Sequence, residues 1–306
     1  MSEADEAAAL WSAFVIHPLT LRENEVYALS TPQGKAALRL HRVGYQTADA
    51  IRSELWWCAA LRDVGLPVPG PIAADDGSHV ARIGSGRLAS VVTWVEGAPL
   101  GAAGVPLGGT PDDQAAQHLA LGRLLAQVHK TTDSLTLPDF FTRPGWDRIG
   151  LVGDAPLWGR FWDHPALVPA DRATLIAARA YLADHLARTA SPTGLIHADV
   201  LRENVFVNGD ALTLIDFDDS GFGYRWFDLG TVLSQCLAEP AYERIKAALI
   251  AGYQTTADID PAEVDAFTLA RTCASVGWAM TRLPPGHAVH ASHIARAVSF
   301  ARACMG

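Results

Sequence analysis

The sequence predicts an α+β protein in two parts, a small antiparallel sheet followed by a mostly helical remainder. Short apolar runs separated by turn residues fill the first hundred positions, which is typical of a sheet. A stretch rich in Gly, Pro and Ala at residues 96–111 then interrupts this pattern. Beyond it, apolar residues recur mainly at helical spacing. We therefore expect an N-terminal lobe over residues 1–97 and a C-terminal lobe over residues 98–306.

Composition narrows the class of protein. With 306 residues, of which 49% are hydrophobic and 19% charged, the chain can bury a sizeable core. The 24 basic and 33 acidic residues give a net charge of −9, which argues against a nucleic-acid partner. No apolar run reaches the roughly 18 residues of a membrane span, and the N-terminus is acidic where a signal peptide would be basic. We expect a cytoplasmic protein with no membrane partner, and the widely spaced cysteines predict neither a zinc site nor disulfides.

The elements of the N-terminal lobe follow from local patterns. TLRENEVYALS and AALRLHR, joined by the turn PQGK, predict two paired strands. A helix follows, because Thr47 is a good N-cap, apolar residues then recur at helical spacing, and Gly65 marks the end. PIAADDGSHVARI and RLASVVTWV predict two further strands, which complete this lobe.

The C-terminal lobe is predicted to be mostly helical. Thr110 and Pro111 open a helix whose apolar residues line one face. Residues 138–167 predict a long irregular segment, and its tryptophans are expected to pack it against the rest of the protein. Further helices are expected at about 170–187, 227–238, 241–254, 261–280 and 287–303. Short strands are expected at 195–197, 204–208 and 212–217, and Asn208-Gly209-Asp210 joins the last two as a hairpin.

Polar residues gather at the ends of this hairpin. His197, Asp199 and Asn204 lie in the loop that enters it, and Asp216 lies where its second strand leaves. We therefore expect Asp199, Asn204 and Asp216 to converge, and their oxygen atoms favour Mg²⁺ over Zn²⁺. The spacing His-x-Asp-x-x-x-x-Asn, followed by Asp at a strand end, matches the catalytic loop and metal site of kinases. The alternative is a polar loop closing a hairpin, with His197 a core histidine.

An ion pair is expected in the N-terminal lobe. Glu54 lies near the apolar face of its helix, where an unpaired carboxylate would cost several kcal/mol. Arg39, inside an apolar strand, is its best partner, and kinases use such a strand-to-helix pair to position the α- and β-phosphates. Kinases carry Lys at this place, and Arg preserves the charge but not the geometry. The alternative is that both side chains are solvated.

Other nucleotide contacts are weaker predictions. LRENEVYAL contains no GxGxxG, so backbone amides at the Glu23–Asn24 turn would have to cover the phosphates. The backbone of Trp94, Val95 and Glu96 is expected to meet the adenine base, although such residues are as often plain core.

The acceptor is expected to be a small molecule. Only a short segment separates Asp216 from Asp228, which leaves little platform for an extended peptide. A group of acidic and aromatic residues is expected to bind an amino group on the acceptor, through charge attraction and aromatic stacking. These residues are Asp218, Asp219, Tyr224, Trp226 and Trp278. The alternative is a solvated turn beside core aromatics.

Taken together, HADVLRENVFVN and LIDFDDSGFGYRWFDLG resemble the aminoglycoside phosphotransferase and choline/homoserine kinase family. The segments ENEVYAL, ALRLHR, IRSELWW, GLPVPGPI, VVTWVEGAPL, LGRLLAQVH and FDLGTVL follow the order of that family over most of the chain. The chain is also similar to bacterial stress-response kinases of the same superfamily. The resemblance implies a two-lobed, protein-kinase-like fold, with ATP (GTP as the alternative) and Mg²⁺ as cofactors.

The resemblance also implies a role for each matched position. Asp199 would be the catalytic base, Asn204 and Asp216 would hold Mg²⁺, and His197 would brace the loop. Asp228 would be a buried structural carboxylate beneath that loop. The expected reaction moves the γ-phosphoryl group of ATP to a hydroxyl of a small molecule, such as an amino alcohol or a homoserine-, choline- or aminoglycoside-like compound. The alternatives are a protein Ser/Thr kinase of the stress-response type and a nucleotide-binding regulator without turnover.

Overall fold

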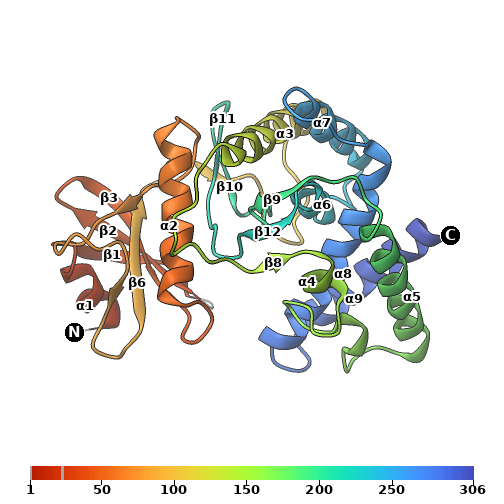
Figure 1. Ribbon diagram of the computed structural model, residues 1–306, viewed down its shortest axis with the longest axis horizontal. Coiled ribbons are helices and arrows are strands. Elements are labelled where there is room, and N and C mark those ends of the chain that lie inside the picture. The colour runs from red at the N-terminus through yellow and green to blue at the C-terminus, as the bar shows by residue number, and fades with distance from the viewer. Residues whose placement is uncertain (1, 22–23) are drawn as a thin grey trace. The chain divides into compact units, whose positions relative to one another are not determined.

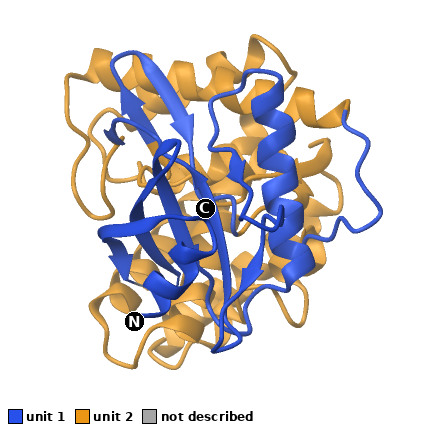
Figure 2. Ribbon diagram, turned by 90° about the vertical axis from the view of Figure 1, so that its left-hand side faces the viewer, with its two compact units in different colours: residues 1–98, 135–143, 206–218 blue, residues 99–134, 144–205, 219–306 orange. Residues whose placement is uncertain are grey.

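The computed structural model describes residues 2–21 and 24–306. The chain forms two compact units, which Figure 2 shows in different colours. The first comprises residues 1–98, 135–143 and 206–218, and the second comprises residues 99–134, 144–205 and 219–306. Of the expected phosphate-covering turn, Asn24 is described, whereas Glu23 lies outside the described residues.

An antiparallel sheet forms much of the first unit, as predicted. Its strands follow the order β1 (Phe14–Leu21), β2 (Glu25–Thr31), β3 (Gly34–Leu40), β6 (Leu88–Thr93) and β4 (Pro71–Ile72), and β5 (Ala81–Arg82) also pairs with β6. The predicted hairpin is confirmed, because β2 and β3 pair from Glu25 opposite Leu40 to Thr31 opposite Gly34. Strand β1 was not predicted as a separate strand. Most of its side chains are exposed, so it lacks the alternation of buried and exposed positions that reveals a strand in sequence.

Two helices belong to the first unit, α1 (Glu3–Ala9) and α2 (Ala48–Asp63). Helix α2 begins where predicted, because the Thr47 side chain accepts a hydrogen bond from the backbone N–H of Ala50. Helix α1 was not predicted, since its run of acidic residues and alanines carries no long apolar side chain. Its buried alanines pack with Trp11 into the core of the sheet.

The second unit contains most of the helices (Figure 1). These are α3 (Pro111–Asp133), α4 (Arg148–Val152), α5 (Pro169–Leu186), α6 (Trp226–Ser234), α7 (Tyr242–Gln254), α8 (Val264–Arg282) and α9 (Ala288–Met305), with 3₁₀ turns η1 (Phe161–Asp163) and η2 (Pro261–Glu263). The sequence predicted all of the long ones to within a few residues. Over the described ranges, no helix combines the length and apolar character that crossing a bilayer requires.

Helices α3 and α7 pack side by side along the second unit (Figure 1). Two glycines allow their backbones to approach closely. A Cβ atom added to Gly122 would lie 2.1 Å from the carbonyl oxygen of Leu249, and one added to Gly252 would lie 2.1 Å from that of Leu119. Any side chain at either position would therefore force the two helices apart.

The short strands differ from the prediction in two ways. The hairpin of β10 (Val205–Asn208) and β11 (Ala211–Leu214) is present in the sheet β11-β10-β7, with β7 at Ala98–Pro99, but β11 ends before Asp216 instead of continuing to residue 217. The backbone of Asp216 has φ of 63°, which no strand accommodates. Strand β9 (Thr193–Ile196) instead pairs with β12 (Gly221–Tyr224), in a separate sheet with β8 (Gly145–Trp146).

A histidine is buried uncharged in the first unit. His41 follows β3, is only 3% exposed, and places its Nε2 2.8 Å from the hydroxyl oxygen of Ser90. Burial, helped by repulsion from Arg39, lowers the pKa of His41 to about 3. In the unfolded chain the histidine binds a proton near its ordinary pKa of about 6.5, whereas the folded protein binds it only at much lower pH. Between these two pKa values, protonation therefore stabilises the unfolded state alone.

His41 therefore predicts that the free energy of unfolding falls as the pH is lowered from about 6.5 toward about 3. In His41→Gln, whose amide reaches the position of Nε2, this slope should be shallower by up to about 1.4 kcal/mol per pH unit. Urea unfolding between pH 7.5 and 4.5 measures both slopes, and His79→Gln, an exposed histidine of the same unit, is the matched control. Parallel curves for wild type and His41→Gln would contradict this explanation.

Candidate active site

A buried carboxylate holds the loop that begins at His197. Asp228, in the first turn of α6, is fully buried and accepts hydrogen bonds from the backbone N–H groups of His197 at 2.9 Å and Ala198 at 2.7 Å. The Nε2 of His129 on α3 lies 3.0 Å from the same carboxylate. These contacts fix the course of the loop at its entry, where Ala198 has φ of 65°, a conformation that non-glycine residues rarely adopt.

The charge state of this cluster follows from its surroundings. Burial lowers the pKa of His129, although the Asp228 carboxylate opposes that shift, so the imidazole is neutral. An ionised carboxylate can only accept hydrogen bonds, so the proton of His129 lies on Nε2. Its Nδ1 then accepts a hydrogen bond from the hydroxyl of Tyr253, at 2.9 Å. The loop therefore rests on a continuous chain of hydrogen bonds that reaches α7.

Asp199 is a partly exposed carboxylate of this loop, with 18% of its side chain accessible. Its Oδ2 accepts a hydrogen bond from the amide nitrogen of Asn204 at 3.0 Å, and its Oδ1 accepts one from Nη2 of Arg271 at 2.7 Å. The backbone N–H of Asp199 also donates to Nδ1 of His197 at 3.3 Å. Two side chains therefore fix the direction in which this carboxylate points.

Asn204 uses only one end of its amide within the described residues. Its nitrogen donates to the backbone oxygen and the carboxylate of Asp199, at 2.9 and 3.0 Å. The amide oxygen accepts no hydrogen bond in that part of the chain. It is a hard oxygen donor of the kind that binds Mg²⁺.

In the first unit, the predicted ion pair between Arg39 and Glu54 is present. Nη1 of Arg39 on β3 lies 3.0 Å from Oε1 of Glu54 on α2. Nη2 of the same arginine lies 2.6 Å from Oδ1 of Asp216, a contact that sequence reasoning missed. Burial opposes the charge of Arg39, but these two carboxylates outweigh it and raise its pKa above the ordinary value.

Asp216 combines backbone strain with exposure. Its φ of 63° places it with Ser12 and Ala198 as the described non-glycine residues at positive φ. Its side chain is 40% accessible, and one carboxylate oxygen contacts Arg39. Strained backbone of this kind clusters at functional sites, where the surrounding structure holds it in place.

The structure does not support the acceptor role predicted for Asp218. Its side chain is buried in the first unit, where Oδ2 accepts a hydrogen bond from the amide nitrogen of Asn24 at 2.9 Å. Asn24 in turn accepts from the backbone N–H of Arg42 at 2.9 Å. Burial tends to raise the pKa of Asp218, but the nearby Arg39 outweighs it, and the pKa is lowered. The other oxygen, Oδ1, is buried without a hydrogen-bond partner.

The aromatic residues predicted to contact the acceptor have different surroundings in the structure. Trp226 is 3% exposed and packs edge-on against Phe267, so it belongs to the core. Tyr224 also packs against Phe267 and donates its hydroxyl proton to the carbonyl of Leu186, at 3.0 Å. The structure therefore does not support the acceptor role predicted for these two residues: Tyr224, at the end of β12, has its hydroxyl bonded to the backbone, and Trp226, the first residue of α6, is buried. Trp278 on α8 is half-buried and lies against His293 and Arg282.

Asp219 lies in the second unit, where it attracts Arg271 electrostatically. Its carbonyl oxygen accepts a hydrogen bond from the indole nitrogen of Trp146 at 2.7 Å, which fixes the backbone here. Trp94, Val95 and Glu96 follow β6 in a segment of the first unit without regular secondary structure. In the described part of the chain, their backbone amides and carbonyls have no backbone partner.

Sequence reasoning also missed two arginines. Arg143, from the irregular segment, donates to the carbonyl of Ala50 on α2 at 3.0 Å and to those of Phe217 and Asp218. It thereby ties the segment that follows Asp216 to α2. Arg271 is a charged residue in an apolar helix, the same signal that drew attention to Glu54, and it would have been found by the same reasoning.

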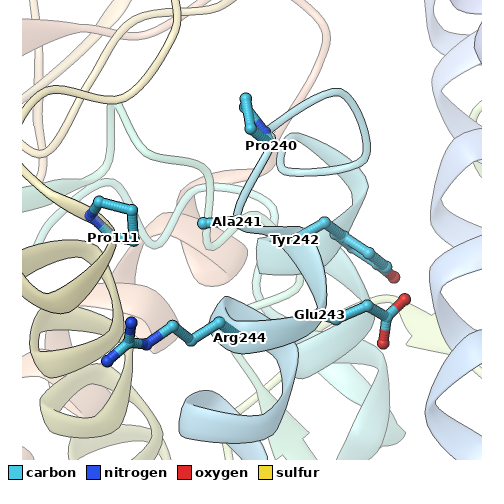
Figure 3. Close-up of a pocket in the computed structure, with 6 residues that line it drawn as sticks. All are labelled: Pro111, Pro240, Ala241, Tyr242, Glu243 and Arg244. Atoms are coloured by element: carbon cyan, nitrogen blue, oxygen red, sulfur yellow. The ribbon is translucent and has the colours of Figure 1, made fainter.

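A surface pocket of about 510 Å³ lies elsewhere, at the first turns of α3 and α7 (Figure 3). It is lined by Pro111, Pro240, Ala241, Tyr242, Glu243 and Arg244. Arg244 pairs with Asp112 across the two helices. None of the predicted site residues lines this pocket, so it is not the candidate active site.

Comparison with known proteins agrees with the resemblance seen in the sequence. The sequence model of the phosphotransferase enzyme family matches residues 16–267. The homoserine kinase of Sinorhizobium fredii is 30% identical over 292 residues, covering 91% of this chain and 83% of that protein. The homoserine kinase of Sinorhizobium medicae is also 30% identical, covering 86% and 78%.

Solved structures show the same fold. The microcompartment-associated aminopropanol kinase is 28% identical and superposes with a TM-score of 0.83, covering 97% of this chain and 94% of that one. An amicoumacin kinase in complex with AMP-PNP, 20% identical, has a TM-score of 0.76 over 97% and 92% of the two chains. The predicted α+β, protein-kinase-like fold is therefore confirmed, and this chain belongs to the phosphotransferase enzyme family.

Proposed function

We propose that this phosphotransferase moves the γ-phosphoryl group of ATP, bound with Mg²⁺, to a hydroxyl group of a small molecule related to the amino alcohols. The family and the homoserine and aminopropanol kinases among the similar proteins support this reaction class. The observation that carries the proposal is the Asp199 loop, in which a partly exposed carboxylate is held by Asn204 and Arg271 above the buried Asp228.

Asp199 acts as the base in this proposal. The acceptor oxygen forms a bond to the γ-phosphorus, its proton passes to the Asp199 carboxylate, and the bond between the γ-phosphorus and the β–γ bridging oxygen breaks to release ADP. Phosphoryl transfer depends mainly on positioning, and here the loop supplies it. Because Asn204 and Arg271 each hold one carboxylate oxygen, the side chain has little freedom to turn away.

The residues proposed to hold Mg²⁺ are Asn204 and Asp216, and their chemistry fits that ion. Asn204 presents an amide oxygen that accepts no hydrogen bond within the described residues, and Asp216 presents a carboxylate that is 40% accessible. Both are hard oxygen ligands. When bound, the ion would neutralise charge on the transferring phosphates.

The first unit is proposed to bind the nucleotide. The guanidinium of Arg39, oriented by Glu54, would face the α- and β-phosphates, as the strand-to-helix pair of kinases does. The backbone of Trp94 to Glu96 would bind the base, since its amides and carbonyls have no backbone partner in the described part of the chain. Titration calorimetry with ATP and GTP, each with and without Mg²⁺, compares the two nucleotides directly.

Two other functions remain as alternatives, a protein Ser/Thr kinase and a nucleotide-binding regulator without turnover. Radiolabel transfer from ATP to a panel of amino alcohols, hydroxy amino acids and proteins separates all three. Label on small molecules supports the proposal, and label on proteins alone supports a protein kinase. Nucleotide binding with no labelled product supports the regulator.

Replacing Asp199 by Asn should reduce turnover while nucleotide affinity stays near that of the wild type. The expected loss is roughly 10²–10⁴-fold in kcat, which is typical of removing a general base. Because the change also removes a partner of Arg271, the melting temperature must be measured alongside the rate. Asp184→Asn, which breaks an exposed ion pair with Arg188, is the matched control and should behave like the wild type. A folded Asp199→Asn enzyme of undiminished rate would overturn the assignment.

Replacing Asp216 by Asn should weaken nucleotide binding in the presence of Mg²⁺ by at least about tenfold, the lower end of losses seen around metal ligands. Binding without Mg²⁺ should change much less, because the lost charge acts on the ion. Calorimetric titration of ATP with and without Mg²⁺ gives both affinities. Asp210→Asn, at the exposed turn of the same hairpin, is the control. Equal losses with and without Mg²⁺ would argue that Asp216 acts through Arg39 rather than through the metal.

A further inference from the structure

The segment of residues 138–167 packs against α8, the helix that carries Arg271. Its backbone and that of the helix come very close at one point. A Cβ atom added to Gly277 of α8 would lie 2.5 Å from the carbonyl oxygen of Gly159 and 2.8 Å from that of Trp158. Contact at this distance leaves no space for the segment to slide, so the place of Trp158 is set relative to α8.

The ring of Trp158 is also fixed by a second tryptophan. Trp158 is 5% exposed and meets Trp146 edge-on, with the ring centroids 4.7 Å apart and the planes at 84°. The indole nitrogen of Trp146 donates a hydrogen bond to the carbonyl oxygen of Asp219 at 2.7 Å. Turning the Trp158 ring would therefore displace another buried ring, and the face of Trp158 has a defined direction.

The guanidinium of Arg271 lies over that face, 4.7 Å from the ring centroid. Its Nη2 donates to Oδ1 of Asp199 at 2.7 Å, and its Nη1 donates to the hydroxyl oxygen of Ser275 at 2.8 Å. Its Nε is buried without a hydrogen-bond partner in the described part of the chain. The proposed base is thus held by a cation that has an aromatic ring as its further support.

That support matters because other groups compensate the charge of Arg271 incompletely. Arg271 is 4% exposed, and burial lowers its pKa, although the attraction of Asp199 and Asp219 opposes the shift. Arg282 repels it. The face of an indole ring attracts a cation, and the attraction is stronger when the cation is removed from water. Trp158 provides such a face at the place where Arg271 needs it.

We propose that Trp158 is a positioning residue for phosphoryl transfer: its ring holds the Arg271 guanidinium in the place from which it orients the Asp199 carboxylate. This inference rests on the proposed function, since it concerns the base of that reaction. The segment of residues 138–167 contributes to catalysis in this way through α8. Displacing a reacting group by about 1 Å can lower a rate by about 10²-fold, so a loss of this support should reduce kcat rather than weaken binding.

The same segment offers a matched control. Trp162 is 3% exposed and lies 4.0 Å from the guanidinium of Arg179, which pairs with Asp154 at 2.8 Å. This group has the same three parts, a buried tryptophan, an arginine and an aspartate, but it includes none of the predicted site residues. Changes at Trp162 therefore measure the structural cost of altering a buried tryptophan in this segment.

The first test replaces Trp158 alone by tryptophans that carry one to four fluorine atoms. Fluorine draws electron density from the ring face, which weakens the attraction of a cation, and the shape of the ring stays nearly the same. With the acceptor that reacts best in the radiolabel panel, kcat should fall with each fluorine, by at least about tenfold for four. KM for ATP should change by less than about twofold. The same series at Trp162 should leave kcat near that of the wild type. A constant kcat across the series at Trp158 overturns the proposal.

Ordinary variants show whether Trp158 acts through Arg271. Trp158→Leu should lower kcat by at least about tenfold, and Trp158→Phe should retain more activity because it keeps an aromatic face. In an Arg271→Leu enzyme, Trp158→Leu should cause little further loss, since both changes break one chain of contacts. Losses that multiply in the double variant contradict the proposal. Melting temperatures, with Trp162→Leu as the control, report the structural cost.

A stability measurement separates this inference from the proposed function, because it requires no turnover. Urea unfolding of Trp158→Phe, Asp199→Asn and the double variant gives the coupling between the two side chains. The coupling should be present with Arg271 and absent in the Arg271→Leu background. If it behaves so but no acceptor is phosphorylated, the proposed function fails and the positioning role stands. If the two changes are additive with Arg271 in place, the positioning role is overturned whatever the activity.

Discussion

The proposed chemistry of the second unit depends on the hydrogen bonds that the buried Asp228 carboxylate accepts, since this carboxylate has no contact with solvent. A charge in this position is stable only when enough donors surround it, and its donors are the backbone of the loop before Asp199 and the ring of His129. The cost of burying the charge is therefore recovered only when the loop has its native course. The same contacts that stabilise the carboxylate hold Ala198 in a conformation that alanine avoids by about 1–2 kcal/mol.

The first unit uses buried charge in a similar way. Arg39 joins a strand, a helix and the segment after β11, because it contacts Glu54 and Asp216 at once. Arg143 reaches the next two residues of that segment through their carbonyl oxygens. The backbone around Asp216 is thus fixed by two arginines from distant parts of the sequence. In both units a strained residue of the stretch from HADVLREN to LIDFD is held by charge rather than by a regular strand or helix.

Sequence patterns predicted the features that depend on local chemistry. Thr47 and Thr110 cap their helices as expected, since a threonine hydroxyl just before a helical pattern can accept a hydrogen bond from a backbone N–H of the first turn. Glu54 implied Arg39 because a carboxylate on an apolar face needs a cation. The patterns did not predict Asp216 outside the strand, since Asp adopts positive φ more often than most residues but far less regularly than Gly. They also did not reveal the surroundings of Tyr224 and Trp226, because Phe267, which is distant in the sequence, packs against both rings.

The close crossing of α3 and α7 has a consequence for how the molecule would respond to change. His129 lies about two turns after Gly122 on the same face of α3, and Tyr253 follows Gly252 on α7, so the crossing sets the register in which Tyr253 meets His129. That imidazole in turn meets Asp228, and Asp228 meets the loop of Asp199. The orientation of the Asp199 carboxylate thus depends partly on how closely the backbones of α3 and α7 approach at two glycines, which themselves bear no functional group. A methyl group added at either glycine would separate the two helices, and the position of the Asp199 carboxylate would change together with their packing.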